Sequence, residues 1–253
     1  MKLRNIVAVT VASVAVAGCD LFAYDNFDPP ASVISGQLEF NGEAVPMRGH
    51  VQNVSIWQIP DDTLQYPTWR TTSFGVLVNQ DGTFRGLIYD GTYEASIEST
   101  GGPFVPNNAR TPFVMRGSHE LDMSIVPYYT IEDETITYDP NAGIGGGAIT
   151  ATFRVGQHDT SRLVDLVALY ISPVNTVDHV NVFSIPTSQR ERNKAAIQAE
   201  LDTNGLITIT VNLPADVHRM PQPEPRAHVF VRVGVKPVGV TERVYTHVYK
   251  IDI

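Results

Sequence analysis

Hydrophobic and polar residues alternate along most of this chain, and a period of two residues is typical of β-strands with one buried face. In the first half the pattern covers residues 33–40, 51–59, 74–78, 83–88, 92–98 and 121–127. Turn signals such as Asn41-Gly42 and Asp81-Gly82 separate several of these runs, because Asn and Gly tolerate the positive φ angles of tight hairpins. We therefore expect an antiparallel β-domain over residues 33–128.

The second half repeats the pattern, which predicts a second sandwich over residues 129–253. The alternating runs cover residues 148–155, 165–172, 206–211, 227–235 and 244–251. Short strands separated by turn residues are typical of immunoglobulin-like and fibronectin type III-like folds. One stretch departs from the pattern. Residues 188–201 begin with a capping Ser188 and hold good helix formers, which predicts a helix. The alternative is a strand-bearing loop, with an element near 195–201 that leads into a turn at 202–205.

The fold class predicted from these strands is all-β, with two tandem β-sandwiches. Residues 139–147 combine a Pro-Asn pair with a Gly-rich run, a composition typical of a boundary between domains. The alternative is an earlier boundary near Tyr128-Tyr129-Thr130, which divides the chain into domains of residues 33–128 and 129–253.

The N-terminus has the layout of a bacterial secretion signal. Lys2 and Arg4 precede an apolar run over residues 6–17, which is shorter than the roughly 20 residues of a membrane-spanning helix. The run ends in Val16-Ala17-Gly18-Cys19, which resembles the lipobox of bacterial lipoproteins. We therefore expect residues 1–18 to be a signal peptide and Cys19, the only cysteine, to be lipidated. The alternative is ordinary secretion with an unpaired thiol.

Charge and composition narrow the range of partners. Cleavage after residue 18 removes Lys2 and Arg4 and leaves 16 basic and 27 acidic side chains, a formal charge of −11. Such a charge disfavours binding to nucleic acid or to anionic membrane surfaces. Residues 19–32 hold adjacent prolines and several acids without periodicity, and they are predicted to be a tether. Contact with a membrane is therefore expected only through the lipid anchor.

No catalytic signature is present in the sequence. It lacks a Gly-x-Ser-x-Gly elbow, a His-Glu-x-x-His pair, a phosphate-binding loop and a cysteine pair for a structural metal. Of the seven histidines, His228 and His247 lie in predicted strands and could face each other, although exposed strand histidines are commoner than metal sites. The acidic runs at 61–62 and 132–134 are interpreted as solvated surface. We expect no enzyme activity, no metal and no cofactor.

The order of several short motifs resembles known families. Ala44-Val45-Pro46, Asp81-Gly82-Thr83-Phe84 and Gly91-Thr92-Tyr93 resemble a transthyretin-like or carboxypeptidase-regulatory-like β-sandwich. Residues 24–30 (YDNFDPP), 101–106 (GGPFVP) and 126–129 (VPYY) resemble a family of Bacteroidota lipoproteins of unknown function. Members of that family accompany starch-utilisation-like transporter pairs in polysaccharide-utilisation operons. The resemblance implies a lipoprotein of the outer membrane that faces the cell exterior and has such a transporter pair as its partner.

Aromatic residues are the candidates for a ligand site, because sugar rings stack on Trp and Tyr faces while polar groups bind the hydroxyls. Trp69 and Tyr66 belong to a Pro-containing loop with polar neighbours, and Trp57 lies on the strand face opposite Ile56. These three rings are the predicted contacts for a polysaccharide or oligosaccharide, with Trp57 the weakest; the alternative is that they pack against the sandwich. Two functions remain, a glycan-binding lipoprotein serving a neighbouring transporter, or a structural accessory subunit of the transporter complex without a sugar site.

Overall fold

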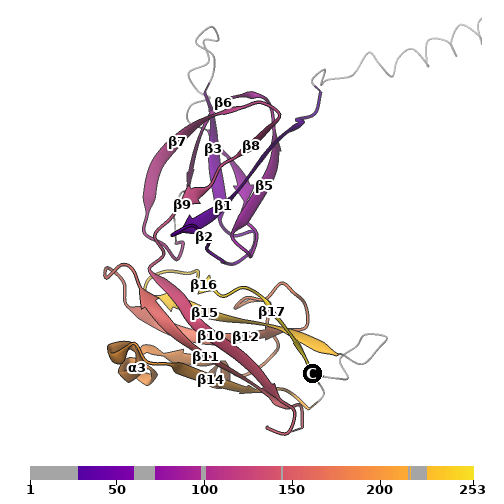
Figure 1. The fold of residues 1–253 in the computed structure, drawn as a ribbon, viewed down its shortest axis with the longest axis vertical. Coiled ribbons are helices and arrows are strands. Elements are labelled where there is room, and N and C mark those ends of the chain that lie inside the picture. The colour runs from indigo at the N-terminus through magenta and orange to yellow at the C-terminus, as the bar shows by residue number, and fades with distance from the viewer. Residues whose placement is uncertain (1–27, 60–71, 98–100, 144, 216, 218–226) are drawn as a thin grey trace, which may run out of the picture.

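The structure, a computed structural model, describes residues 28–59, 72–97, 101–143, 145–215, 217 and 227–253. Within these ranges strands dominate and form four sheets, two in each of two sandwiches that lie end to end (Figure 1). The predicted all-β fold with two tandem β-sandwiches is confirmed. No helix among the described residues is long and apolar enough to cross a membrane.

The first sandwich is built around β1 (Ser32–Phe40). In one sheet β1 pairs antiparallel with β2 (Glu43–Ala44) and β5 (Thr83–Ile88), and parallel with β8 (Ser118–Glu120) and β9 (Met123–Ser124). The opposite sheet has the antiparallel order β4 (Phe74–Leu77), β3 (Asn53–Ile59), β6 (Gly91–Ile97) and β7 (Asn107–Met115). Alternate side chains of both sheets meet in one core, as the period of two predicts, and its largest fully buried members include Phe84, Phe104 and Met115.

The second sandwich has a three-stranded sheet and a five-stranded sheet. The first is β10 (Tyr129–Asp139), β11 (Ala148–Gln157) and β14 (Ile207–Asn212), all antiparallel. The second has the order β13 (Glu191–Asn193), β12 (Val164–Ser172), β15 (His228–Pro237) and β16 (Val244–Tyr245), and β17 (Tyr249–Asp252) also pairs with β15. Valines at 229, 231, 233 and 235 point from β15 into the core. Every second side chain of β15 therefore points away from this core, which places Arg232 on the outer face.

The single helix predicted over residues 188–201 is wrong. The segment instead contains a short strand, as the strand-bearing alternative predicts. It forms α2 (Thr187–Arg190), strand β13, a 3-10 turn η2 (Lys194–Ala196) and α3 (Gln198–Thr203). Pairing of β13 with β12 overrides the helix propensity of the middle of the segment, and the Asn193 side chain caps η2 by accepting from the Ala196 N–H. The predicted turn at 202–205 is present, with Asn204 in the left-handed region at φ 51°.

Residues 139–147 do not separate the sandwiches, so this candidate boundary is wrong. Asp139 pairs with Ala148 across an antiparallel ladder, and the Gly-rich run between them is the turn from β10 to β11. Pro and Gly cluster both in linkers and in tight turns, and here they make a turn. The chain crosses from one sandwich to the other between β9 and β10, where Ile125 is buried in the first core and Tyr128 in the second.

Candidate functional site

Arg232 joins the two sandwiches from a fully buried position. Its guanidinium donates four hydrogen bonds to backbone carbonyl oxygens. Nε donates to Thr246 (2.8 Å), Nη1 to Met47 (3.1 Å) and Val177 (3.2 Å), and Nη2 to Gln80 (3.0 Å). Met47 and Gln80 belong to the first sandwich and the other two acceptors to the second. We call this group of five residues the joint.

The joint is held by neutral partners rather than by a carboxylate. The Tyr245 ring lies 4.4 Å from the guanidinium carbon of Arg232, within the range of a cation–π contact. Burial lowers the pKa of Arg232 to about 10, so the guanidinium remains positive at neutral pH. Burial also raises the pKa of Tyr245, whose phenol therefore stays neutral. Carbonyl dipoles and an aromatic face thus compensate the buried charge.

Further contacts fix the sandwiches beside the joint. Val244 is buried in the core of the first sandwich although it belongs to β16 of the second. The next residue, Tyr245, donates its N–H to the carbonyl of Pro46 (3.1 Å). Arg48 of the first sandwich forms salt bridges with Asp178 (3.7 Å) and Glu242 (3.5 Å) of the second. These contacts define one relative position of the two sandwiches.

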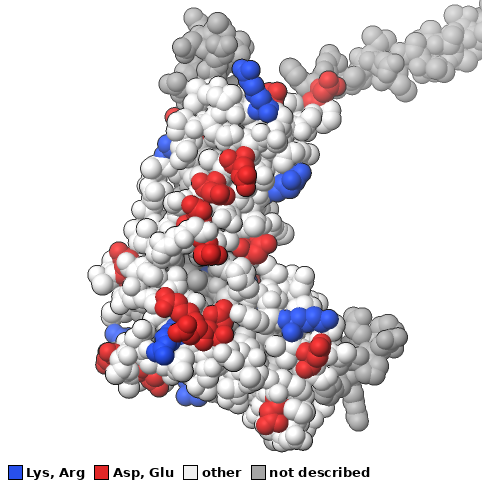
Figure 2. Space-filling view, viewed as in Figure 1, with Lys and Arg blue, Asp and Glu red and all other residues white. Residues whose placement is uncertain are grey.

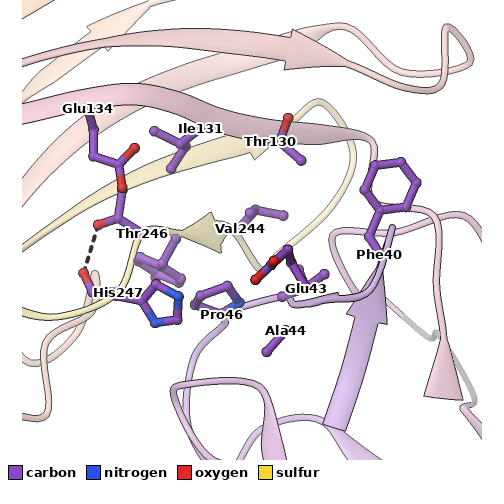
Figure 3. A pocket seen from close by; sticks show the side chains of 12 residues that line it. Phe40, Glu43, Ala44, Pro46, Thr130, Ile131, Glu134, Val244, Thr246 and His247 are labelled. Carbon is purple, nitrogen blue, oxygen red and sulfur yellow. Dashed lines mark hydrogen bonds between the residues drawn. The ribbon is translucent and has the colours of Figure 1, made fainter. Parts of the chain in front are cut away.

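A pocket of about 180 Å³ opens between the sandwiches next to these contacts (Figure 3). Its lining residues come from three segments of the chain, 40–46, 130–134 and 244–247. The first sandwich contributes Phe40, Glu43, Ala44, Val45 and Pro46, and the second contributes Thr130, Ile131, Glu134, Val244, Tyr245, Thr246 and His247.

The β1–β2 hairpin forms the wall of the pocket that belongs to the first sandwich. Asn41 and Gly42 have φ angles of 56° and 83°, as the sequence predicts for a two-residue hairpin turn. Phe40 and Glu43 therefore become cross-strand partners, and such partners project to the same side of a hairpin. The Phe40 ring also packs on the His158 ring at 4.5 Å between centroids. A ring and a carboxylate thus lie side by side.

A β-bulge in β10 accompanies the placement of Glu134 on the opposite wall. The register with β11 shifts between Glu132 and Thr135, and Asp133 takes a positive φ of 51°. Bulges of this kind redirect side chains. The Glu134 Oε1 atom accepts a hydrogen bond from the Tyr249 hydroxyl of β17 (2.7 Å). Burial, this hydrogen bond and the charge of Glu134 raise the pKa of Tyr249 to about 12, so the phenol remains a donor.

The polar groups that a ligand in the pocket can reach belong to Glu43, Glu134 and His247, because the hydroxyls that line the pocket have protein partners. The Thr130 hydroxyl contacts Glu132 and His158, and the Thr246 hydroxyl accepts from the Val233 N–H and donates to the His247 carbonyl. The Tyr245 hydroxyl lies 2.8 Å from His179 Nδ1. Protein partners occupy these hydroxyls and the Glu134 Oε1 atom, so the Glu43 carboxylate, the Glu134 Oε2 atom and the His247 imidazole remain for a ligand. The pocket combines hydrogen-bonding groups with apolar surface and suits a small polyhydroxylated ligand.

Trp57, one of the predicted sugar contacts, lies in a different hollow. The side chain is only 4% exposed, and the Arg110 guanidinium covers its ring at 3.9 Å from the centroid. Arg110 in turn pairs with Glu94 (3.3 Å). These residues, with Gln58 and Ile59, line a hollow of about 240 Å³ on the first sandwich. Stacking of a sugar on Trp57 stays a prediction and would require Arg110 to move.

Tyr66, Trp69 and Cys19 lie outside the described residues. His228 pairs in register with Asp252 and packs edge-on against Phe230 (5.2 Å), whereas His247 lines the pocket, so the two histidines do not face each other. No group of three or more His, Cys, Asp or Glu residues suited to a metal occurs in the described part of the chain.

The sequence did not indicate Phe40, Glu134 or His247 as neighbours. The lining segments 40–46, 130–134 and 244–247 are about 80 to 200 positions apart, and no local pattern links residues so far apart. Glu134 belonged to a run interpreted as solvated surface. One local signal was usable, because an Asn-Gly hairpin turn places its flanking residues, Phe40 and Glu43, opposite each other.

Comparisons with known proteins identify the same two-part organisation. Residues 32–126 match the model described as the N-terminal domain of a protein of unknown function (DUF3823), and residues 136–250 match the domain of unknown function DUF3823_C. No curated protein matches the chain.

Solved structures with the same fold come from Bacteroides and Parabacteroides. A DUF3823 family protein from Parabacteroides merdae ATCC 43184 aligns over 89% of this chain and 100% of its own, with a TM-score of 0.70 and 21% identity. One from Bacteroides ovatus ATCC 8483 aligns over 87% and 98%, with a TM-score of 0.69 and 20% identity. A structure from Bacteroides uniformis ATCC 8492, described as a "putative carbohydrate binding protein", aligns over 89% and 100%, with a TM-score of 0.67 and 16% identity. With both domain models matched in order along the chain, this protein belongs to the DUF3823 family, a family of unknown function.

Proposed function

We propose that this protein is a cell-surface lipoprotein that binds glycan in the pocket between its sandwiches and presents it to an outer-membrane transporter. The observation that carries the proposal is the pairing of the Phe40 ring with the Glu43 carboxylate, facing Glu134 and His247 across one cavity (Figure 3). A sugar offers a C–H face for an aromatic ring and hydroxyl donors for carboxylates. Both requirements are met at one place.

The size of the pocket bears on which part of a glycan it accepts. Its volume of about 180 Å³ lies below the roughly 300–1,000 Å³ of pockets for drug-sized ligands. A single sugar unit at a chain end or side branch is therefore the proposed occupant, with the rest of the polymer outside.

The joint supports binding by holding both walls in place before a ligand arrives. Four hydrogen bonds from one buried guanidinium link the sandwiches, and Val244 fills the core of the first sandwich. A preorganised site avoids the ordering cost that a hinged pair of domains would have on binding. The description of the Bacteroides uniformis relative, which names carbohydrate binding, is in keeping with this role.

The surface location and the transporter partner come from the sequence. Cys19 with its lipobox-like residues supports a lipid anchor, and the resemblance described above supports an outer-membrane transporter pair. The competing function is an accessory subunit of the transporter complex that has no sugar site of its own. Co-purification with a transporter pair in the absence of glycan binding would favour that alternative.

Affinity electrophoresis against plant, algal and microbial glycans tests the proposal. The wild-type protein should be retarded by at least one glycan, and Phe40→Ala should weaken that binding about tenfold, because loss of a stacking ring costs on the order of 1–3 kcal/mol. Tyr89→Ala is the matched control, since it removes an exposed ring of the same sandwich that does not line the pocket. A thermal melt of each variant separates loss of the site from loss of the fold.

The predicted aromatic loop is compared in the same experiment. If Tyr66→Ala and Trp69→Ala abolish retardation while Phe40→Ala does not, the glycan binds at the loop and the pocket is not the site. If no glycan retards the wild-type protein, the binding function itself is refuted.

A further inference from the structure

In the described residues, the acidic side chains of the pocket are not matched by basic ones. Two of its lining side chains are glutamates, one from each sandwich, and Lys and Arg do not occur among the described residues that line it. Figure 2 shows acidic side chains gathered on both sides of the junction on the face where β1 and β10 lie. A ligand in the pocket therefore meets a negative potential from both walls.

Neither glutamate forms a salt bridge with a basic side chain of the described residues. Glu134 accepts from the Tyr249 hydroxyl, a neutral donor that orients the carboxylate and leaves its charge in place. Glu43 is exposed at the edge of the hairpin.

Arg232, the fully buried cation of the joint, cannot serve an acidic ligand either. Arg232 lies beneath the Tyr245 ring, and its Nε, Nη1 and Nη2 atoms already donate to backbone carbonyls. The described residues that line the pocket offer no guanidinium group to an acidic sugar, and bidentate pairing with Arg is the usual way in which proteins bind carboxylate or sulfate groups.

On the basis of the proposed glycan function, we infer that the pocket selects uncharged sugar units and excludes acidic ones such as uronic acids and sulfated sugars. The hydroxyls of a neutral sugar donate to the two carboxylates, and two oxygens on one carboxylate can accept from neighbouring hydroxyls. A carboxylate or sulfate on the ligand would instead face Glu43 and Glu134. One like-charge contact at about 4 Å weakens binding roughly fivefold even with the screening of bulk water, so two such contacts predict a preference of at least tenfold for the neutral unit.

Glycan pairs that differ mainly in charge test this selection. Suitable pairs are methyl-esterified and de-esterified homogalacturonan, xylan and glucuronoxylan, and agarose and carrageenan, each in affinity electrophoresis at low and high salt. We expect retardation by a neutral member, retardation at least tenfold weaker by its acidic counterpart, and a smaller difference at high salt because screening reduces the repulsion. Equal or stronger retardation by the acidic member overturns the inference and leaves the binding function standing. Retardation by none of the glycans refutes the binding function and the inference with it.

A variant without the two charges tests whether the preference for neutral sugars arises from Glu43 and Glu134. The double variant Glu43→Gln with Glu134→Gln keeps both side-chain shapes, and the amide oxygen introduced at position 134 can still accept from the Tyr249 hydroxyl. It should reduce the preference for the neutral member to about threefold or less. Glu200→Gln, in helix α3 and outside the pocket, is the control and should keep the full preference. A double variant with an unchanged preference would show that the selection does not arise from these carboxylates and would overturn the inference.

Discussion

Replacing Arg232 with methionine tests whether one buried side chain couples the two sandwiches. Methionine has a similar length and no charge, so Arg232→Met removes four hydrogen bonds while keeping much of the packing. Breaking a buried charged network by removing one partner typically costs about 3–5 kcal/mol. We expect the lower part of that range, because Gln80 O also accepts from the Met47 N–H (3.2 Å) and because the buried guanidinium no longer needs compensation.

Calorimetry measures the effect directly. A protein of this size loses about 2–4 °C in Tm for each kcal/mol, so a cost of about 3–4 kcal/mol should make Arg232→Met melt about 6–16 °C lower than the wild type. We also expect one cooperative transition in the wild type and two in the variant, as the sandwiches unfold separately.

The control lies on the same strand and the same face. Lys236 is four residues further along β15 and pairs with Asp165 at 2.6 Å in a partly exposed position. Exposed pairs contribute at most about 1 kcal/mol, so Lys236→Met should change the Tm by only a few degrees. If Arg232→Met melts like Lys236→Met and keeps a single transition, the reasoning on the joint is refuted.

Three further predictions concern other parts of the chain. Burial and the nearby charges of Arg243 and Arg48 lower the pKa of His179 to about 4, from 6.5. Between these two pH values only the unfolded chain binds this proton, so the free energy of unfolding should fall as the pH drops from 6.5 to 4, by about 1–2 kcal/mol after allowance for partial exposure. His179→Gln should flatten that slope in urea titrations. Gly234→Ala would place a Cβ 2.8 Å from the Tyr170 ring and should cost about 1–3 kcal/mol of stability by thermal melt, whereas an unchanged melt would show that the rings can move apart. Cys19→Ala should abolish lipid labelling and release the protein from the membrane fraction, and unaltered membrane retention would contradict the anchor.

Local patterns predicted the strands because burial in a sandwich alternates residue by residue. Runs such as 148–155 and 227–235 contain most of β11 and most of β15, and the Asn41-Gly42 turn has the expected backbone. These features depend on neighbours within a few residues, which a sequence displays.

Tertiary contacts decided the features that the sequence did not predict. Residues 188–201 have helical propensity, but pairing of Glu191–Asn193 with β12 divides them. Arg232 occupies an outward position of β15, where a charged residue normally meets water; in this protein the first sandwich covers it. The sequence could not predict the pocket for the same reason, because its two walls meet only when the sandwiches pack against each other.

The distances along the chain between contacting residues determine when each part can form. Strand β1 needs partners such as β9, and Gln37 and Asp122 in that region are 85 residues apart. Arg232 and Met47 in the joint are 185 residues apart. Contacts of such separation form slowly, since a long loop must close before they contribute. The first sandwich also lacks Val244 until nearly the whole chain is available, so the pocket cannot be complete before that point. A sugar bound there would stabilise both sandwiches at once.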